Sequence, residues 1–254
     1  MTQQNTNRQE AWAQPVERLK VSDLQSGAVN LNVNGRRVTG PVQGFGQMWQ
    51  KTYSIRLAGA PVSPQELIRE WKEKFPSFWP AGNRFFGRAA AISPGQVAVL
   101  NLAGPGGITP PGGGPLISTG IMVIYADDVS FSFMTPEGHM FAGMITFSAE
   151  REEAELLVQI QALIRASDPL YELTFRMGMG HKMEDDFWLQ TLRNLAAHFH
   201  AQASEPELRR VLVDPRLQWG EAGNLWHNAA IRTMFYTLGA PLRWLAGRFR
   251  GEKH

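Results

Sequence analysis

Cysteine is absent from the 254 residues, and several kinds of chemistry are absent with it. Without thiols the chain cannot form disulfide bonds, bind zinc or iron–sulfur clusters through thiolates, or use a cysteine nucleophile. Residues 1–15 hold no apolar segment typical of a secretory signal. No stretch reaches the about 18 uncharged apolar residues that a membrane-spanning helix needs. We therefore expect a cytoplasmic protein.

A large excess of charge is also lacking. The chain has 25 Lys and Arg residues against 23 Asp and Glu, for a formal net charge of +2. A nucleic-acid-binding protein gathers Lys and Arg on one face, and no such stripe occurs before the C-terminal segment. We therefore expect no nucleic acid among the partners of this protein.

Candidates for metal or nucleotide binding are few. The six histidines are scattered; His181, Glu184 and Asp185 have the helical spacing of metal ligands, but such a triad is more often a solvated helix face. The glycine-rich segment 104–115 contains four prolines and no lysine, unlike a phosphate-binding loop. We expect neither a metal nor a cofactor.

The N-terminal residues 1–43 are predicted to form a polar arm. Within this arm, Asn34-Gly35 stands among alternating apolar and polar residues. An Asn-Gly pair favours the type I′ turn of a two-residue hairpin, since both residues tolerate positive φ. The pattern predicts a short hairpin over residues 29–38.

Residues 44–200 carry alternating strand signals and two helix signals. Residues 48–57 alternate as a strand whose core face includes Tyr53 and Ile55, with Lys51 as its exception. Ser63-Pro64-Gln65-Glu66 has the pattern of a capping box that starts a helix. Further strands are predicted at 97–102, 118–125, 130–134, 139–149 and 155–164, before a long helix over 170–200 that breaks near 177–180. This order favours an α+β fold with an antiparallel sheet.

Particular motifs in this region resemble those of the START-type helix-grip superfamily (SRPBCC), which includes polyketide cyclases and pollen-allergen-like proteins. The motifs are MWQKTY at 48–53, FWPAGNRF at 78–85, FSFMTPEGH at 131–139 and DPLYE at 168–172. The resemblance covers about residues 44–200. It implies a curved antiparallel sheet that grips a long C-terminal helix, with a cavity between them for a lipid or another apolar ligand.

Large apolar side chains are the candidates for lining that cavity, although most such residues serve core packing. The loop with Phe78 and Trp79 is the expected mouth, because exposed loops rarely carry so many aromatic groups. His139 could act as a general base there or be a hydrogen-bonded structural residue. We expect a volume of about 300 Å³ or more. The predicted ligand-binding residues are Trp71, Phe78, Trp79, Phe85, Phe133, His139, Phe175, Met177 and Trp188.

The C-terminal residues 201–254 are predicted to form a helical, basic-amphipathic tail. Residues 225–250 contain four arginines and no acidic residue. Apolar residues recur there at helical spacing, with Pro241 as a kink. This stripe predicts burial against the protein's own domain, a partner subunit or a membrane surface. Its members are Ile231, Met234, Phe235, Leu238, Leu242, Leu245 and Phe249.

Three functions remain open from the sequence. The first is binding or carriage of an apolar small molecule in the helix-grip cavity. The second is a non-catalytic accessory subunit that docks through its N-terminal arm and C-terminal tail. The third is a cyclase-like or hydrolase-like enzyme that uses the same pocket. It comes last because no catalytic motif is evident.

Overall fold

A computed structural model describes residues 11–22, 24–87, 92–110 and 114–240. Strands dominate its first two thirds and helices its last third. In chain order the elements are β1 (Val38–Thr39), η1 (Pro41–Gln43), β2 (Met48–Ala58), α2 (Pro64–Glu73), η2 (Phe75–Phe78), β3 (Arg84–Phe86), β4 (Val97–Leu102), η3 (Pro105–Gly107), β5 (Ile117–Ala126), β6 (Ser130–Pro136), β7 (Phe141–Glu152), β8 (Glu155–Ala166), α3 (Pro169–Arg176), α4 (Met179–His198), β9 (Gln202–Ala203), β10 (Glu207–Asp214), η4 (Trp219–His227) and α5 (Ala229–Leu238).

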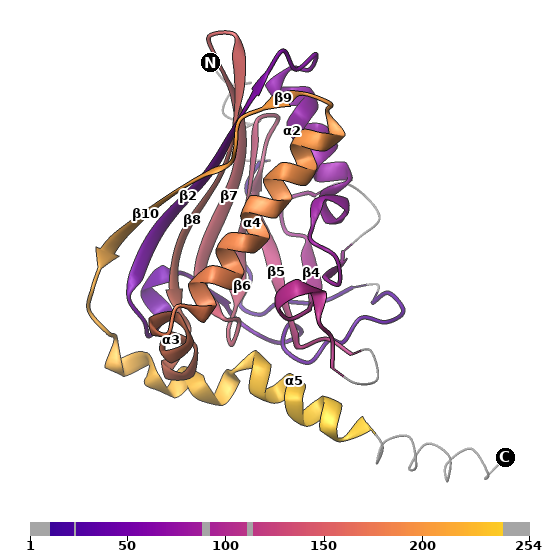
Figure 1. The fold of residues 1–254 in the computed structure, drawn as a ribbon. Coiled ribbons are helices and arrows are strands. Elements are labelled where there is room, and N and C mark those ends of the chain that lie inside the picture. Colours follow the sequence, from indigo (N-terminus) through magenta and orange to yellow (C-terminus); the bar gives the residue numbers. More distant parts are fainter. Residues whose placement is uncertain (1–10, 23, 88–91, 111–113, 241–254) are drawn as a thin grey trace, which may run out of the picture.

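One antiparallel sheet organises these elements. Its strands follow the order β10-β2-β8-β7-β6-β5-β4-β3, with β1 paired to β6 and β9 paired to β2. Figure 1 shows the sheet curving around α4, with α2 near one end of that helix and α5 across the other. The predicted α+β fold, a curved antiparallel sheet gripping a long helix, is confirmed.

The alternation of β2 produces its two faces as predicted. Tyr53, Ile55 and Leu57 are buried, while Arg56 between them is exposed. Lys51 is on the buried face and is fully covered. A lysine at such a position needs anionic partners, because burial of an unpaired ammonium group is strongly unfavourable.

Helix α2 starts at the predicted capping box and closes one end of the core. Ser63 Oγ accepts a hydrogen bond from the Glu66 backbone N–H at 3.2 Å, and Glu66 Oε2 accepts one from the Ser63 N–H at 2.8 Å. The helix buries Trp71, which meets Phe131 and Phe147 edge-to-face. This end of the concave face is filled with aromatic side chains.

The predicted break in the long helix lies at Gly178. This residue has φ +79°, a left-handed conformation that glycine adopts without steric cost, and it separates α3 from α4. Helix α3 starts at Asp168, whose Oδ1 accepts hydrogen bonds from the Leu170 and Tyr171 N–H groups at 2.8 and 3.0 Å. The break lets α4 cross the sheet in its own direction.

The predicted hairpin over residues 29–38 is wrong, although a turn forms at Asn34-Gly35. Gly35 has φ +77° and the Arg36 N–H donates to the Val33 carbonyl at 3.0 Å, but the turn does not join two paired strands, since β1 after it pairs with β6. The backbone of the turn pairs with Leu19 instead. The Leu19 N–H donates to the Arg36 carbonyl at 2.7 Å, and the Gly35 N–H donates to the Leu19 carbonyl at 2.8 Å. Leu19 and Val33 are buried with Met122, so this part of the arm packs on the sheet.

The C-terminal segment is only partly helical. The prediction of helix over 201–254 is wrong for β9 and β10, because Glu207–Asp214 extends the sheet along β2. Helical structure begins at η4 and continues in α5. Leu242, Leu245 and Phe249 of the predicted stripe lie outside the described residues. Among the described helices, none is both long and apolar enough to cross a bilayer.

Candidate functional site

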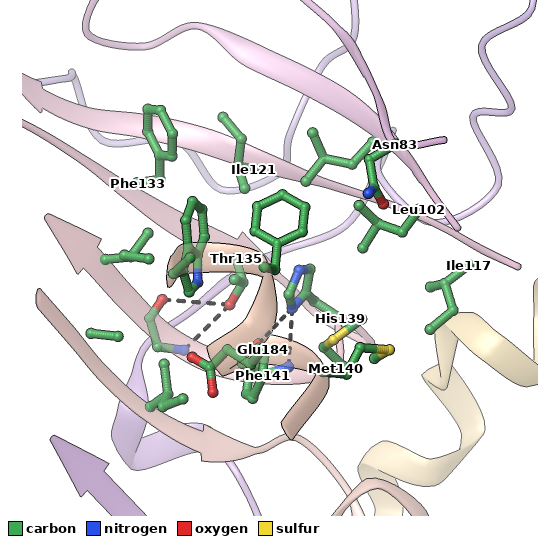
Figure 2. A pocket seen from close by; sticks show the side chains of 18 of the residues that line it. Asn83, Leu102, Ile117, Ile121, Phe133, Thr135, His139, Met140, Phe141 and Glu184 are labelled. Atoms are coloured by element: carbon green, nitrogen blue, oxygen red, sulfur yellow. Dashed lines mark hydrogen bonds between the residues drawn. The ribbon is translucent and has the colours of Figure 1, made fainter. Parts of the chain in front are cut away.

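A cavity of about 130 Å³ lies between the sheet and α4. Strands β4 to β8 form its floor, and Met183, Glu184, Phe187 and Trp188 of α4 cover it. Figure 2 shows apolar side chains around most of the cavity, with Thr135, His139 and Glu184 on one side and Phe133, Ile121 and Leu102 on the other. The volume is smaller than the about 300–1,000 Å³ typical of small-molecule sites. It is close to the about 150 Å³ of an engineered apolar cavity that binds benzene.

Four of the nine predicted site residues line this cavity. Trp79 contributes from the loop after η2, Phe133 from β6, His139 from the turn before β7 and Trp188 from α4. Trp79 and Trp188 both pack edge-to-face on Phe187. The Trp79–Phe187 contact holds α4 against the loop that the sequence indicated as the mouth.

The other five predicted residues lie elsewhere. Trp71 and Phe78 are buried in the aromatic core beside α2, and Phe85 packs on Phe75 and Trp79 without reaching the cavity. Phe175 packs at a tilt against Phe141 and borders a second, much smaller pocket. Met177 precedes the Gly178 break and is 63% exposed, so the expectation that it borders the cavity is wrong. A residue between two helices has no fixed helical face, and the periodicity therefore gave no guide to its direction.

Sequence reasoning missed most of the apolar lining. These side chains alternate along neighbouring strands, which was the available signal, but every strand has two faces and the inner one is known only from the assembled sheet. The missed apolar residues include Leu100, Leu102, Ile117, Ile121, Met140, Phe141, Ile145 and Ile164.

His139 brings a hydrogen-bonding group to this apolar surface. It follows Gly138, whose φ of +88° turns the chain from β6 into β7. The Phe141 N–H donates to His139 Nδ1 at 3.0 Å. Burial lowers the pKa of His139 to about 4, so the ring is neutral at pH 7. Nδ1 also lies 3.2 Å from the Phe141 carbonyl oxygen, so its contacts fit either neutral tautomer. Nε2 has no hydrogen-bond partner among the described residues, and it donates or accepts according to the tautomer.

Glu184 brings a carboxyl group to the same cavity. Its Oε2 accepts a hydrogen bond from Lys51 Nζ at 2.5 Å, and the rest of the described chain offers Oε1 no partner. Burial raises the pKa of Glu184 to about 7, despite the nearby Lys51 ammonium group. Near neutral pH this carboxyl group therefore exists in both protonation states, and Oε1 can accept or donate a hydrogen bond.

A charged network behind the cavity wall holds Glu184 in place. Lys51 Nζ also donates to Asp185 Oδ1 at 2.9 Å, and Tyr53 Oη donates to the same oxygen at 2.7 Å. Arg210 of β10 donates to Asp185 Oδ2. Glu184 and Asp185 are thus buried, and the interpretation of this helix face as solvated is wrong. The sequence could not pair them with Lys51, which is more than 130 residues away.

Trp79 lines the cavity with its apolar ring, while its polar atom is covered. Its indole Nε1–H is buried and has no hydrogen-bond partner in the described part of the chain. An unpaired buried donor costs about 1–3 kcal/mol, and this one is not accessible from the cavity. His139 Nε2 and Glu184 Oε1 are therefore the unpaired polar atoms that this largely apolar cavity offers a ligand among the described residues.

These groups favour recognition over acid–base catalysis by His139. A base with a pKa of about 4 takes up a proton poorly at pH 7. Within the ranges that the structure describes, no group of three His, Cys, Asp or Glu side chains could hold a metal ion. Glu184 is the lining group whose pKa lies closest to neutrality.

Comparisons with known proteins give similarity in structure only. No family model and no curated protein matches the sequence. The di-domain ARO/CYC protein StfQ of the steffimycin biosynthetic pathway matches with a TM-score of 0.45 and 13% identity over 61% of this chain. The match spans about half of StfQ, 51% of its length.

Two smaller proteins match over most of their length. Ginseng major latex-like protein 151 from Panax ginseng has a TM-score of 0.41 and 17% identity, covering 61% of this chain and 99% of its own. Protein Ms6760 from Mycobacterium smegmatis has a TM-score of 0.38 and 13% identity, covering 59% of this chain and 90% of its own. At these TM-scores none of the likenesses bears on function.

Proposed function

We propose that this protein binds a small, largely apolar molecule in the cavity between the sheet and α4. The observation that carries the proposal is the cavity itself, a space of about 130 Å³ walled by side chains of five strands, a loop and α4. Close packing is the rule in protein interiors, and an empty apolar space of this size costs stability. The volume suits a ligand of about one ring, by comparison with the about 150 Å³ cavity that takes benzene.

The polar groups of the lining further restrict the chemical groups that a ligand would carry. His139 Nε2 and Glu184 Oε1 both lack partners among the described residues and are available to hydrogen-bond a ligand. A ligand with a hydroxyl or carbonyl group would satisfy one or more of them. A strongly charged ligand is disfavoured, because the remaining walls are apolar and desolvation of the charge would go uncompensated.

The test uses two one-ring compounds that differ by a single hydroxyl group, toluene and p-cresol, with thermal unfolding and calorimetric titration as readouts. At about ten times its Kd, a ligand of the folded state should raise the unfolding midpoint by about 3 °C or more. We expect both compounds to bind and p-cresol to bind more tightly. If neither compound shifts the midpoint nor gives a titration signal, the proposal fails.

A cavity-filling variant locates the binding. Ala162 lines the cavity from β8, and Ala162→Leu would occupy part of its volume. Ala58→Leu on β2 makes the same change outside the cavity. Binding should be lost in Ala162→Leu and kept in Ala58→Leu. Equal affinity in both variants would place the ligand elsewhere and contradict the proposal.

A further inference from the structure

Helix α5 presents its large apolar side chains to solvent. The residues that face the protein are small or polar: Ala229 and Thr233 are buried, one helical turn apart. On the opposite face Phe235 is 66% exposed and Leu238 is 68% exposed, and Met234 beside them is also exposed. A helix that packs only on its own domain has the reverse arrangement. No described part of the chain covers this outer face.

Other exposed apolar residues gather at the same end of the molecule. Trp219 and Trp226 of η4 are exposed, the latter by 83%. Leu173 of α3 and Met177 after it are exposed as well. Figure 1 shows α3, η4 and α5 together beneath the sheet, and the Ala230 N–H of α5 donates to Tyr171 Oη of α3 at 3.0 Å. Monomeric proteins seldom expose so many large apolar groups at one end.

The charge of the segment has one sign. From residue 222 to residue 251 the sequence contains no Asp or Glu, but it contains Arg232, Arg243, Arg248 and Arg250. Arg232 is exposed on α5, to one side of the apolar face, and its Nε donates to Asn32 Oδ1 at 2.8 Å. The pKa of Arg36 is lowered by two main causes. The larger is burial of its guanidinium group, and the next is the positive charge of Arg232. Positive charge thus borders the apolar face.

We propose that this end of the protein, whose described surface is formed by η4 and α5, docks on an anionic lipid bilayer. Exposed Phe, Leu and Met on one face of α5, Arg232 beside that face and exposed tryptophans in the preceding η4 are the features of a helix that lies in the bilayer interface. The tryptophans place an apolar ring and a polar N–H at the same depth as the headgroups. The arginines attract anionic headgroups.

The docking surface adjoins the cavity, although the proposal does not depend on a ligand there. Ala229 of α5 packs in one cluster with Ile117 and Met140, which both line the cavity. Figure 2 shows α5 beside these two residues. Docking of α5 would therefore bring the end of the cavity near Ile117 close to the lipid surface.

The test is co-sedimentation of the full chain with vesicles of phosphatidylcholine alone and of phosphatidylcholine with about 30% phosphatidylserine. We expect binding to the anionic vesicles at low salt, and weaker binding as salt is raised, because ionic screening removes the attraction of the arginines. The double variant Phe235→Ser/Leu238→Ser should lower the partition coefficient by about tenfold or more. Both side chains are exposed, so its unfolding midpoint should not change.

The matched control is Val211→Ser/Val213→Ser, which removes two exposed apolar side chains from β10, outside the docking surface. It should bind anionic vesicles as the unchanged protein does. Three results would overturn the proposal: no binding to anionic vesicles, equal loss in both double variants, or a dimer in solution that only Phe235→Ser/Leu238→Ser converts to monomer. The last result would identify the face as a contact between two copies of this chain.

Discussion

Helices α4 and α5 depart from ordinary amphipathic packing in opposite ways. Helix α4 turns Glu184 and Asp185 into the protein, where both are buried. Helix α5 turns Phe235 and Leu238 away from the protein, where both are exposed. Each departure must be balanced, because buried charge and exposed apolar surface are both unfavourable.

The two helices differ in where the balancing partner lies. For α4 it is internal, since Lys51 and Arg210 bond to its two carboxylates. Helix α5 is attached through polar contacts, such as the Ser118 N–H to Thr233 Oγ1 at 3.0 Å, and its apolar face has no cover among the described residues. The buried charges are thus part of this fold's own stability, whereas the exposed apolar face indicates an external surface.

The strongest way to break this comparison is to remove the internal partner of α4. Lys51→Met should lower the free energy of unfolding by about 3–5 kcal/mol, because Glu184 and Asp185 would lose the cation that compensates their burial. Urea unfolding measures the effect. Lys182→Met is the matched control, since Lys182 forms an exposed ion pair with Asp186 on the same helix and should contribute little. Equal effects of the two changes would contradict an internal balance.

The pH dependence of stability sharpens the same point. Burial raises the pKa of Glu184 to about 7 from its usual 4.5, so the folded state keeps a proton that the unfolded state releases. Stability from this group is full below about pH 4.5 and is lost as the pH rises through about 7. Relative to Glu184→Gln, the unchanged protein should lose on the order of 3 kcal/mol across this window.

Urea unfolding at several pH values measures this difference. Asp186→Asn, an exposed carboxylate on the same helix, should leave the pH profile unchanged. If the free energy of unfolding changes with pH in parallel for the unchanged protein and for Glu184→Gln, the Glu184 carboxyl group has the same pKa in the folded and unfolded states. That result would contradict the effect of its burial against the cavity.

Local patterns carried most of the fold prediction. The period of β2, the capping box at Ser63 and the break at Gly178 depend on neighbouring residues, and the sequence displays them directly. The edge strand β10 was missed, because both of its faces are largely exposed and its pattern has no clear alternation. The packing of the N-terminal arm was missed for a related reason, since Leu19, about 16 positions away, holds the Asn34-Gly35 turn.

The candidate site was less predictable, because its members meet only in the folded chain. Trp79, His139 and Glu184 belong to a loop, a turn and a helix. The sequence marked Lys51 as the exception on a core face, but nothing local pointed to its carboxylate partners. An aromatic residue such as Trp71 has the same local pattern whether it fills a core or lines a cavity, and packing alone decides between them.

The last prediction concerns the attachment of α5, where the expected effect is smallest. Asn228 caps this helix through Oδ1, which accepts from the Ile231 N–H at 3.0 Å, and its Nδ2 donates to Asp168 Oδ2 at 2.7 Å. Asn228→Ala should cost about 2 kcal/mol, from the lost cap and a buried carboxylate left without its amide donor. Asn228→Ser keeps a capping oxygen but is too short for Asp168, so it should cost about half as much. Hydrogen exchange of the α5 amides, together with urea unfolding, measures both changes. If Asn228→Ala alters neither, polar contacts do not hold α5 to the fold, and its contrast with α4 disappears.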